Sequence, residues 1–115
     1  MSSSYHPLGR KPAQRRMLLR NLVTSLILYE SIRTTQTRAK AIVPILERML
    51  TRAKGRPPHI AVRFLNRFLT DKNASRKVME VLLPRLKERP FGHTRISPLG
   101  RRMGDGAAMV TVSLK

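Results

Sequence analysis

The chain has 115 residues, with 24 Lys and Arg against 6 Asp and Glu and a formal net charge of +18. It contains no Cys, which excludes disulfides and thiolate metal sites. Its hydrophobic fraction of 41% is too high for a disordered basic tail, and no apolar run approaches the roughly 18 residues of a membrane span. Because a compact domain with this charge repels itself unless a polyanion screens it, the composition indicates nucleic acid as the partner.

The first 12 residues are basic and show no hydrophobic periodicity. We expect residues 1–12 to form a flexible arm that orders only in complex. No acid precedes Glu30, and an acid-poor start with Ser and Arg is also typical of an organelle-targeting segment. We favour an RNA-contacting arm, because its basic residues continue directly into a predicted helix.

Apolar residues recur at helical spacing over residues 13–28 and predict a first helix, with Arg16 and Arg20 one turn apart. The short, partly β-branched run 31–35 predicts a strand or an extended link. A second helix begins near Thr35 or Thr37, either of which can cap it, and ends at Gly55. Pro44 lies inside this helix and should kink or divide it.

A third helix is predicted over residues 59–69, and a fourth over residues 74–83, capped by Asn73 and disturbed by Pro84. Residues 94–97 and 109–114 alternate as strands, with a loop rich in Gly and Arg at 98–106. The sequence therefore predicts an α+β, two-layer fold in the order helix, strand, three helices, two strands. Residues 13–115 form its single domain, with the helices packed on a small mixed sheet.

Two acid-free basic segments are the strongest functional signal. The arm and first helix hold the first cluster, and the segment between Glu88 and Asp105 holds the second. Arg outnumbers Lys by 17 to 7, and the Arg fork pairs bidentately with phosphate. With four times as many cations as anions, most of these cations lack an internal acidic partner, so we expect both segments to contact phosphates.

The enzyme hypothesis has little support. The three His residues are scattered without metal-ligand spacing, so we expect surface or RNA-contacting histidines. The acids never occur as a close pair, and each is expected to pair with a nearby Arg. Neither of two glycine-rich phosphate-binding motifs, G-x-x-x-x-G-K-[ST] and G-x-G-x-x-G, is present in the sequence. We therefore expect no catalytic residue, metal, cofactor or small-molecule substrate. The cationic helices also allow the hypothesis that the protein binds a membrane surface. The apolar stripes of these helices are suited to packing on one another, which disfavours that hypothesis.

Several linked motifs resemble the ribosomal protein L-seventeen family of the bacterial and organellar large subunit. They are RNLVTSLI at residues 20–27, ESIRTT at 30–35, RAK at 38–40, TRAK at 51–54, DK at 71–72, LLPR at 82–85, RPFGHTRI at 89–96 and GRRMGDGAAM at 100–109. They occur in family order, and the match covers nearly everything from Gly9 to Leu114. Several ordered motifs are far more specific than any one of them alone.

The resemblance implies an α/β protein that binds large-subunit rRNA near the rim of the nascent-chain exit tunnel, beside other ribosomal proteins and without catalysis. It also implies the positions that contact RNA. These are Gly9, Arg10, Lys11, Arg15, Arg16, Arg20, Asn21, Thr34, Thr35, Arg38, Lys40, His93, Thr94, Arg95, Arg101 and Arg102.

The start of the chain departs from the family pattern. The arm is shorter than usual and lacks the family's Ser-Ser-His-Arg block before the first helix. This departure and the acid-free start favour a mitochondrial protein over one of the bacterial cytoplasm. The main alternative to a ribosomal subunit is a free-standing architectural protein that binds DNA, and an enzyme acting on nucleic acid comes third.

Overall fold

The computed structural model describes residues 12–85, 87 and 92–115, so the predicted arm, apart from Pro12, lies outside the described residues. The elements are α1 (Pro12–Tyr29), β1 (Ser31–Thr35), α2 (Gln36–Lys54), α3 (Pro58–Phe68), α4 (Lys72–Lys77), the π-helical turn η1 (Val78–Leu82), α5 (Leu83–Arg85), β2 (Thr94–Arg101) and β3 (Ala108–Leu114). Since α4, η1 and α5 follow one another directly, the order is the predicted one.

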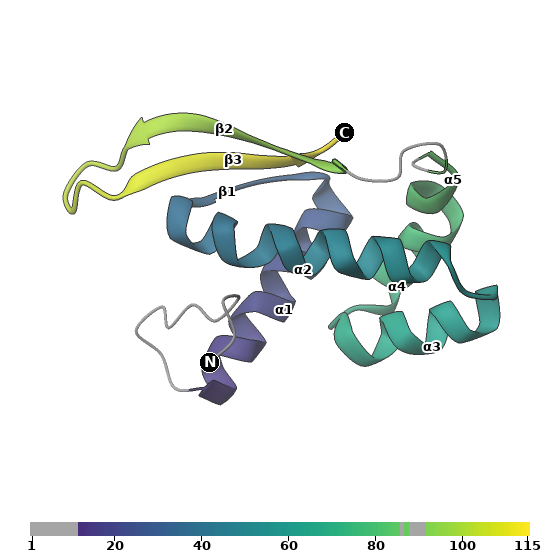
Figure 1. Ribbon diagram of the computed structural model, residues 1–115. Coiled ribbons are helices and arrows are strands. Elements are labelled where there is room, and N and C mark those ends of the chain that lie inside the picture. Colours follow the sequence, from purple (N-terminus) through teal and green to yellow (C-terminus); the bar gives the residue numbers. More distant parts are fainter. Residues whose placement is uncertain (1–11, 86, 88–91) are drawn as a thin grey trace.

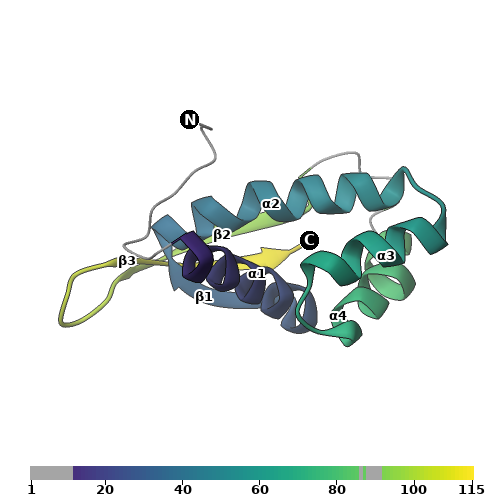
Figure 2. The same ribbon diagram turned by 90° about the horizontal axis from the view of Figure 1, so that it is seen from below.

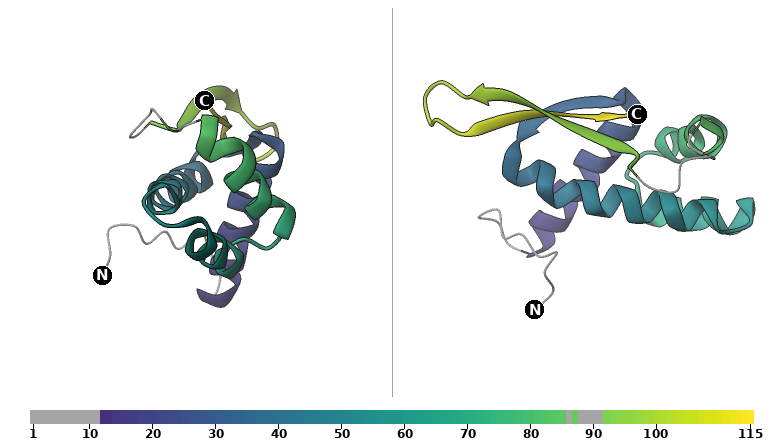
Figure 3. Two further views of the ribbon diagram at one scale, coloured as in Figure 1. Left: turned by 90° about the vertical axis from the view of Figure 1, so that its right-hand side faces the viewer. Right: turned by 45° about the horizontal axis from the view of Figure 1, so that its top comes forward.

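The structure has two layers, with the helices on one face of the sheet (Figures 1 and 3). The sheet order is β1-β3-β2, and both neighbours of β3 pair with it antiparallel. The α+β class is thus confirmed, but the mixed sheet was wrong. β1 and β2 run in the same direction, yet β3 lies between them, so every hydrogen-bonded pair is antiparallel.

The core lies between the two layers and joins elements from the whole domain. Val23, Leu26 and Ile27 of α1 are fully buried, and the other buried apolar residues come from α2, α3 with Leu69 after it, the 72–85 helical segment and β3. The largest of these that are fully buried are Ile42, Leu46, Leu50, Leu65, Val78, Leu82 and Val112. The helical spacing of those that lie on helices is what allowed the helices to be predicted.

Glu30 forms the corner between α1 and β1. Its φ of 63° lies in the left-handed region, its N–H donates to Leu26 O at 2.8 Å, and its carbonyl accepts from Leu114 N at 2.9 Å. Its carboxylate pairs with Lys77 at 3.0 Å and Arg85 at 2.7 Å. Glu30 therefore joins the end of α1 to both the sheet and the 72–85 helical segment.

Acidification tests this corner. The hydrogen bonds from Arg85 and Lys77 lower the pKa of Glu30 from 4.5 to about 2. A depressed carboxyl pKa stabilises the fold fully above the unfolded value and loses that contribution as the pH falls through the folded value. We expect the stability difference between the wild type and Glu30→Gln, measured by urea unfolding, to shrink between pH 4.5 and 2. A difference that is constant with pH would contradict this pairing.

α2 runs without a break through Pro44, so of the two predicted effects, a kink or a division, the division was wrong. Pro44 is exposed, whereas Ile42 and Leu46 on either side of it are fully buried in the common core. Burial of both halves of the helix offsets the hydrogen bond that proline removes. The start agrees with the prediction, because Thr35 Oγ1 accepts from Arg38 N at 3.3 Å.

The 72–85 helical segment begins with a different cap from the predicted one. Asp71 Oδ1 accepts from Asn73 N at 2.8 Å, so Asp71 and not Asn73 is the N-cap. Both residue types cap helices well, and only Asp71 has the extended backbone of a cap here. Near Pro84 the helix has a π-helical hydrogen bond, because Leu83 N donates to Val78 O instead of to the carbonyl four residues earlier.

β2 and β3 form a hairpin that extends beyond the helices (Figure 2). β2 continues to Arg101, so residues 98–101, predicted as loop, are strand. Proline is tolerated at Pro98 because β2 is an edge strand, and the register shifts between Pro98 and Gly100. Positive φ angles at Gly104 (101°) and Gly106 (69°) form the turn.

Candidate nucleic-acid interface

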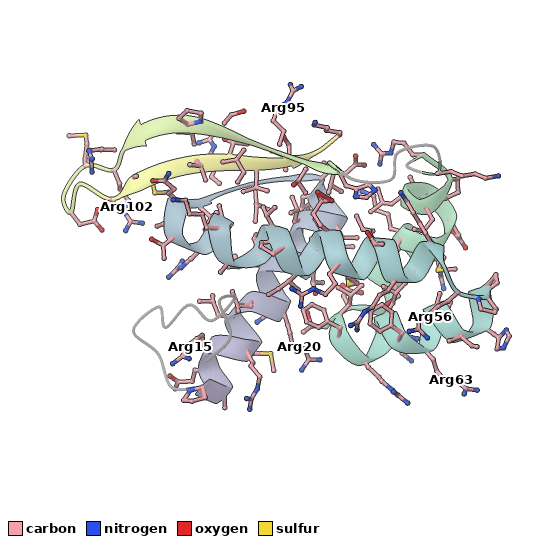
Figure 4. All side chains as sticks on the ribbon, viewed as in Figure 1. Arg15, Arg20, Arg56, Arg63, Arg95 and Arg102 are labelled. Carbon is pink, nitrogen blue, oxygen red and sulfur yellow. The ribbon has the colours of Figure 1, made fainter. Side chains whose placement is uncertain are left out.

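The structure separates the sequence-predicted RNA contacts into three groups. Gly9, Arg10 and Lys11 lie outside the described residues. The other predicted contacts lie on α1, around the β1–α2 junction, and on the β2–β3 hairpin together with His93 just before it. Arg15 and Arg20 are on one side of α2 in Figure 4, and Arg95 projects from the sheet on the other side. These residues therefore do not form a single cluster.

The cations of α1 differ in their surroundings. Arg16 and Asn21 are exposed, whereas Arg15 is only 8% exposed. Arg20 is half-buried and holds the end of α3. Its Nε donates to Phe68 O at 2.7 Å and its Nη2 to Arg67 O at 3.1 Å, and its guanidinium lies 6.0 Å from the Phe68 ring centroid. Arg20 therefore stabilises the negative end of a helix dipole.

The β1–α2 junction combines structural and solvent-facing residues. Thr34 is buried at 4% exposure, and Thr35 caps α2, so both threonines serve the fold. Arg38 is half-buried and Lys40 is exposed. Of the four residues predicted to contact RNA here, only Arg38 and Lys40 carry a positive charge.

At the hairpin tip, arginine side chains bind the turn itself. Arg101 Nη1 donates to Gly106 O at 2.9 Å. Arg102 pairs with Asp105 through Nη2 at 2.5 Å, and this partner lowers the pKa of Asp105 to about 2. Asp105 also stabilises the turn through its Oδ1, which accepts from Ala107 N.

His93 is fully buried, so the expectation of a surface histidine was wrong. Its Nδ1 lies 2.5 Å from Glu47 Oε1, and its backbone N–H donates to both Glu47 oxygens at 3.0 Å. Lys54 Nζ lies 2.7 Å from Nε2. Because an ammonium only donates, Nε2 accepts and Nδ1 carries the proton. This cluster fixes the residue just before β2 to the middle of α2.

The face of the sheet that points away from the helices is rich in hydroxyl groups and cations. Buried Val110 and Val112 mark the inner face, so their neighbours along β3 point outward. The register defines an outer sheet face made of Ser31, Arg33, Ser97, Arg95, Thr111 and Ser113. None of these six residues is acidic. Thr94, by its alternation with Arg95, points inward.

Arg33 is the cation of this face that sequence reasoning missed. It is exposed, and it lies one row from Arg95 on the opposite side of β3. Strand spacing and rise place the two Cα atoms roughly 12 Å apart, so they can contact different phosphates. The alternation of side chains along residues 31–35 was the signal in the sequence that could have placed Arg33 on an outward face. Its position on the same face as Arg95 could not be predicted, because it depends on the order of the strands in the sheet.

Other kinds of site find no support in the described part of the chain. Among residues 12–85, 87 and 92–115, no three His, Asp or Glu side chains are grouped to hold a metal ion. Within the same residues, no helix is both long and apolar enough to cross a membrane.

The fold and its surface define a small, strongly basic α+β protein whose exposed arginines lie on both layers. The family model "Ribosomal protein L17" matches residues 18–115. The chain therefore belongs to the ribosomal protein L17 family, which confirms the resemblance seen in the motifs.

Named relatives extend the match over almost the full chain. The large ribosomal subunit protein bL17 of Caldanaerobacter subterraneus is 44% identical over 96% of this chain and 98% of the relative. The protein of the same name from Desulforudis audaxviator is 46% identical over 96% and 97%. That of Clostridium acetobutylicum is 42% identical over 99% of both. These relatives are bacterial, so the expected preference for mitochondria is not supported.

Proposed function

We propose that the chain is a structural constituent of the large ribosomal subunit that binds and stabilises large-subunit rRNA, without catalysing a reaction. Family membership over residues 18–115 carries the proposal. Relatives that match nearly end to end are named as large-subunit proteins, and the net charge of +18 fits a polyanionic partner.

The distribution of ion pairs supports this role. In the described part of the chain, carboxylates pair with Lys77, Arg85 and Arg102. Most of the other described arginines are exposed, and 6 acids cannot neutralise 24 Lys and Arg. The surplus is available for phosphates, whose neutralisation releases condensed counterions.

The mechanism is electrostatic and geometric. Because exposed cations lie on both layers (Figure 4), the packed domain holds separate RNA segments at fixed spacing. On the outer sheet face, hydroxyl groups stand beside Arg33 and Arg95, a combination suited to phosphates and ribose 2′-hydroxyls. Recognition then follows RNA shape, since side chains cannot read the narrow A-form major groove.

The finer placement rests on the family resemblance. We propose a position near the rim of the polypeptide exit tunnel, with contacts to neighbouring large-subunit proteins. The arm residues Gly9, Arg10 and Lys11 are proposed to extend the RNA contact beyond the domain.

Binding of the isolated protein to matched RNA and DNA duplexes tests this function against the alternative. A structural rRNA-binding protein prefers the A-form duplex at moderate salt, because its contacts match A-form shape and 2′-hydroxyls. Preference for the DNA duplex would support a free-standing architectural protein instead.

Replacing Arg33 and Arg95 by glutamine tests the outer sheet face. We expect the log–log salt dependence of rRNA binding to flatten by roughly 1.5, about 0.7–0.9 for each lost phosphate contact. The control is Lys72→Gln with Arg76→Gln, which removes two exposed charges from α4. Equal slopes for the wild type and the Arg33, Arg95 double variant, measured by filter binding, would exclude phosphate contact at this face.

A further inference from the structure

A groove with a cationic rim runs along the junction of α1, α2 and α3. It consists of two adjoining hollows of about 160 and 260 Å³ that share Ile45 and Phe68 in their walls. Each hollow is smaller than the about 300–1,000 Å³ pockets that take drug-sized ligands. The groove is therefore of a size for one or two small planar groups.

Every charged residue that lines this groove in the described part of the chain is a cation. Arg48 and Arg52 line the first hollow, one turn apart on α2. Arg16, Arg20 and Arg67 line the second. No carboxylate is among the described residues that line either hollow, and Arg16, Arg48, Arg52 and Arg67 are exposed. The charge is complementary to an anionic ligand.

The floor is apolar and partly aromatic. Ile45, Phe64 and Phe68 are half-buried and pack against the core, so one side of each remains accessible from the groove. A paired RNA backbone presents only sugar and phosphate and gains nothing from such a floor. An unstacked base does gain, because bases rest on aromatic side chains and on guanidinium planes.

Arg20 is fixed in this groove before any ligand arrives. Two of its five N–H donors bind the carbonyls of Arg67 and Phe68, which leaves three donors without a partner among the described residues. A guanidinium already held by the fold loses little side-chain entropy when it binds a ligand.

We propose that this groove binds an unpaired nucleotide of RNA, with the base against the apolar floor and the flanking phosphates on the arginine rim. This inference rests on the proposed function and adds a single-stranded contact to the duplex contacts of the sheet. The sequence-predicted set included only Arg16 and Arg20 from this groove. Arg48, Arg52, Phe64 and Phe68 are assigned a ligand by the geometry alone.

Photo-crosslinking from the rim tests the proposal. The photoreactive residue p-benzoylphenylalanine is placed at position 52 of the full-length chain, and large ribosomal particles that carry this variant are irradiated. Because Arg52 is exposed, the substitution spares the core. We expect a crosslink to an rRNA nucleotide that is unpaired. A crosslink to a paired nucleotide, a crosslink to a protein, or no crosslink would overturn the inference.

A charge-matched pair of variants provides the second measurement. Arg48→Gln with Arg52→Gln removes two charges from the groove, and Arg56→Gln with Arg63→Gln removes two from outside it (Figure 4). We expect the first pair to weaken binding to isolated large-subunit rRNA about tenfold more than the second, because only the first removes fork contacts to the phosphates that flank the nucleotide in the groove. Equal losses would contradict the inference.

The outcomes separate this inference from the proposed function. If the wild-type chain neither joins large particles nor binds rRNA, the proposed function fails. If the wild type does both but position 52 crosslinks to protein or the two double variants behave alike, only the nucleotide site fails.

Discussion

Replacing Arg20 by alanine will lower the free energy of unfolding by about 2–4 kcal/mol, because hydrogen bonds to charged groups contribute roughly 1.5–3 kcal/mol each. Arg20 donates to Phe68 O and Arg67 O and covers the Phe68 ring. Its loss leaves the last carbonyls of α3 without these donors and weakens the contact between α1 and α3. Urea denaturation followed by circular dichroism measures the change.

Arg16→Ala is the matched control, one turn earlier on α1. Arg16 is exposed, so its replacement should change stability by no more than about 0.5 kcal/mol. Arg20→Lys should recover little of the stability lost in Arg20→Ala, since a lysine lacks the planar fork that reaches both carbonyls. Equal stability losses for Arg16→Ala and Arg20→Ala would show that Arg20 has no structural role.

Glu47→Ala should destabilise the fold by about 2–4 kcal/mol, because it leaves buried donors without an acceptor. Glu47 accepts from the backbone N–H of His93 at 3.0 Å and lies 2.5 Å from its Nδ1. His93 is fully buried and leads into β2. Amide hydrogen exchange should therefore accelerate in β2 more than in α1, in addition to the lower unfolding free energy.

The conservative variant Glu47→Gln distinguishes the loss of a hydrogen-bond acceptor from the loss of side-chain volume. Glutamine keeps one oxygen acceptor for His93, so we expect a loss less than half of that caused by alanine. If Gln and Ala destabilise equally, the acceptor oxygen is not what holds His93. If neither variant changes the stability or the exchange of β2, the cluster does not anchor the hairpin.

The main elements of this fold follow from local patterns. Helical spacing predicted α1 and α2 to within a residue or two, and Gly55 marked the end of α2. Strand alternation predicted β3, and the short, partly β-branched run at residues 31–35 predicted β1 as a strand or an extended link. The extension of β2 through Pro98 could not be predicted, because tolerance of proline depends on the strand lying at a sheet edge.

The roles of individual charged residues depend on contacts between distant segments. Arg20 meets carbonyls 47 and 48 positions away, and His93 meets Glu47 46 positions away. Composition showed that cations are in surplus, but it cannot show which of them the fold itself uses. For the same reason the groove of Arg48, Arg52 and Phe64 became visible only once α2 and α3 were packed together.

Sedimentation of a cell lysate through a sucrose gradient tests the central claim most directly. The full-length chain is detected by an epitope tag, with and without ribonuclease treatment of the lysate. We predict that the chain sediments with large ribosomal particles and moves to the top of the gradient after ribonuclease digestion. A chain that stays at the top in the untreated lysate, or that sediments with DNA, would contradict the proposed role.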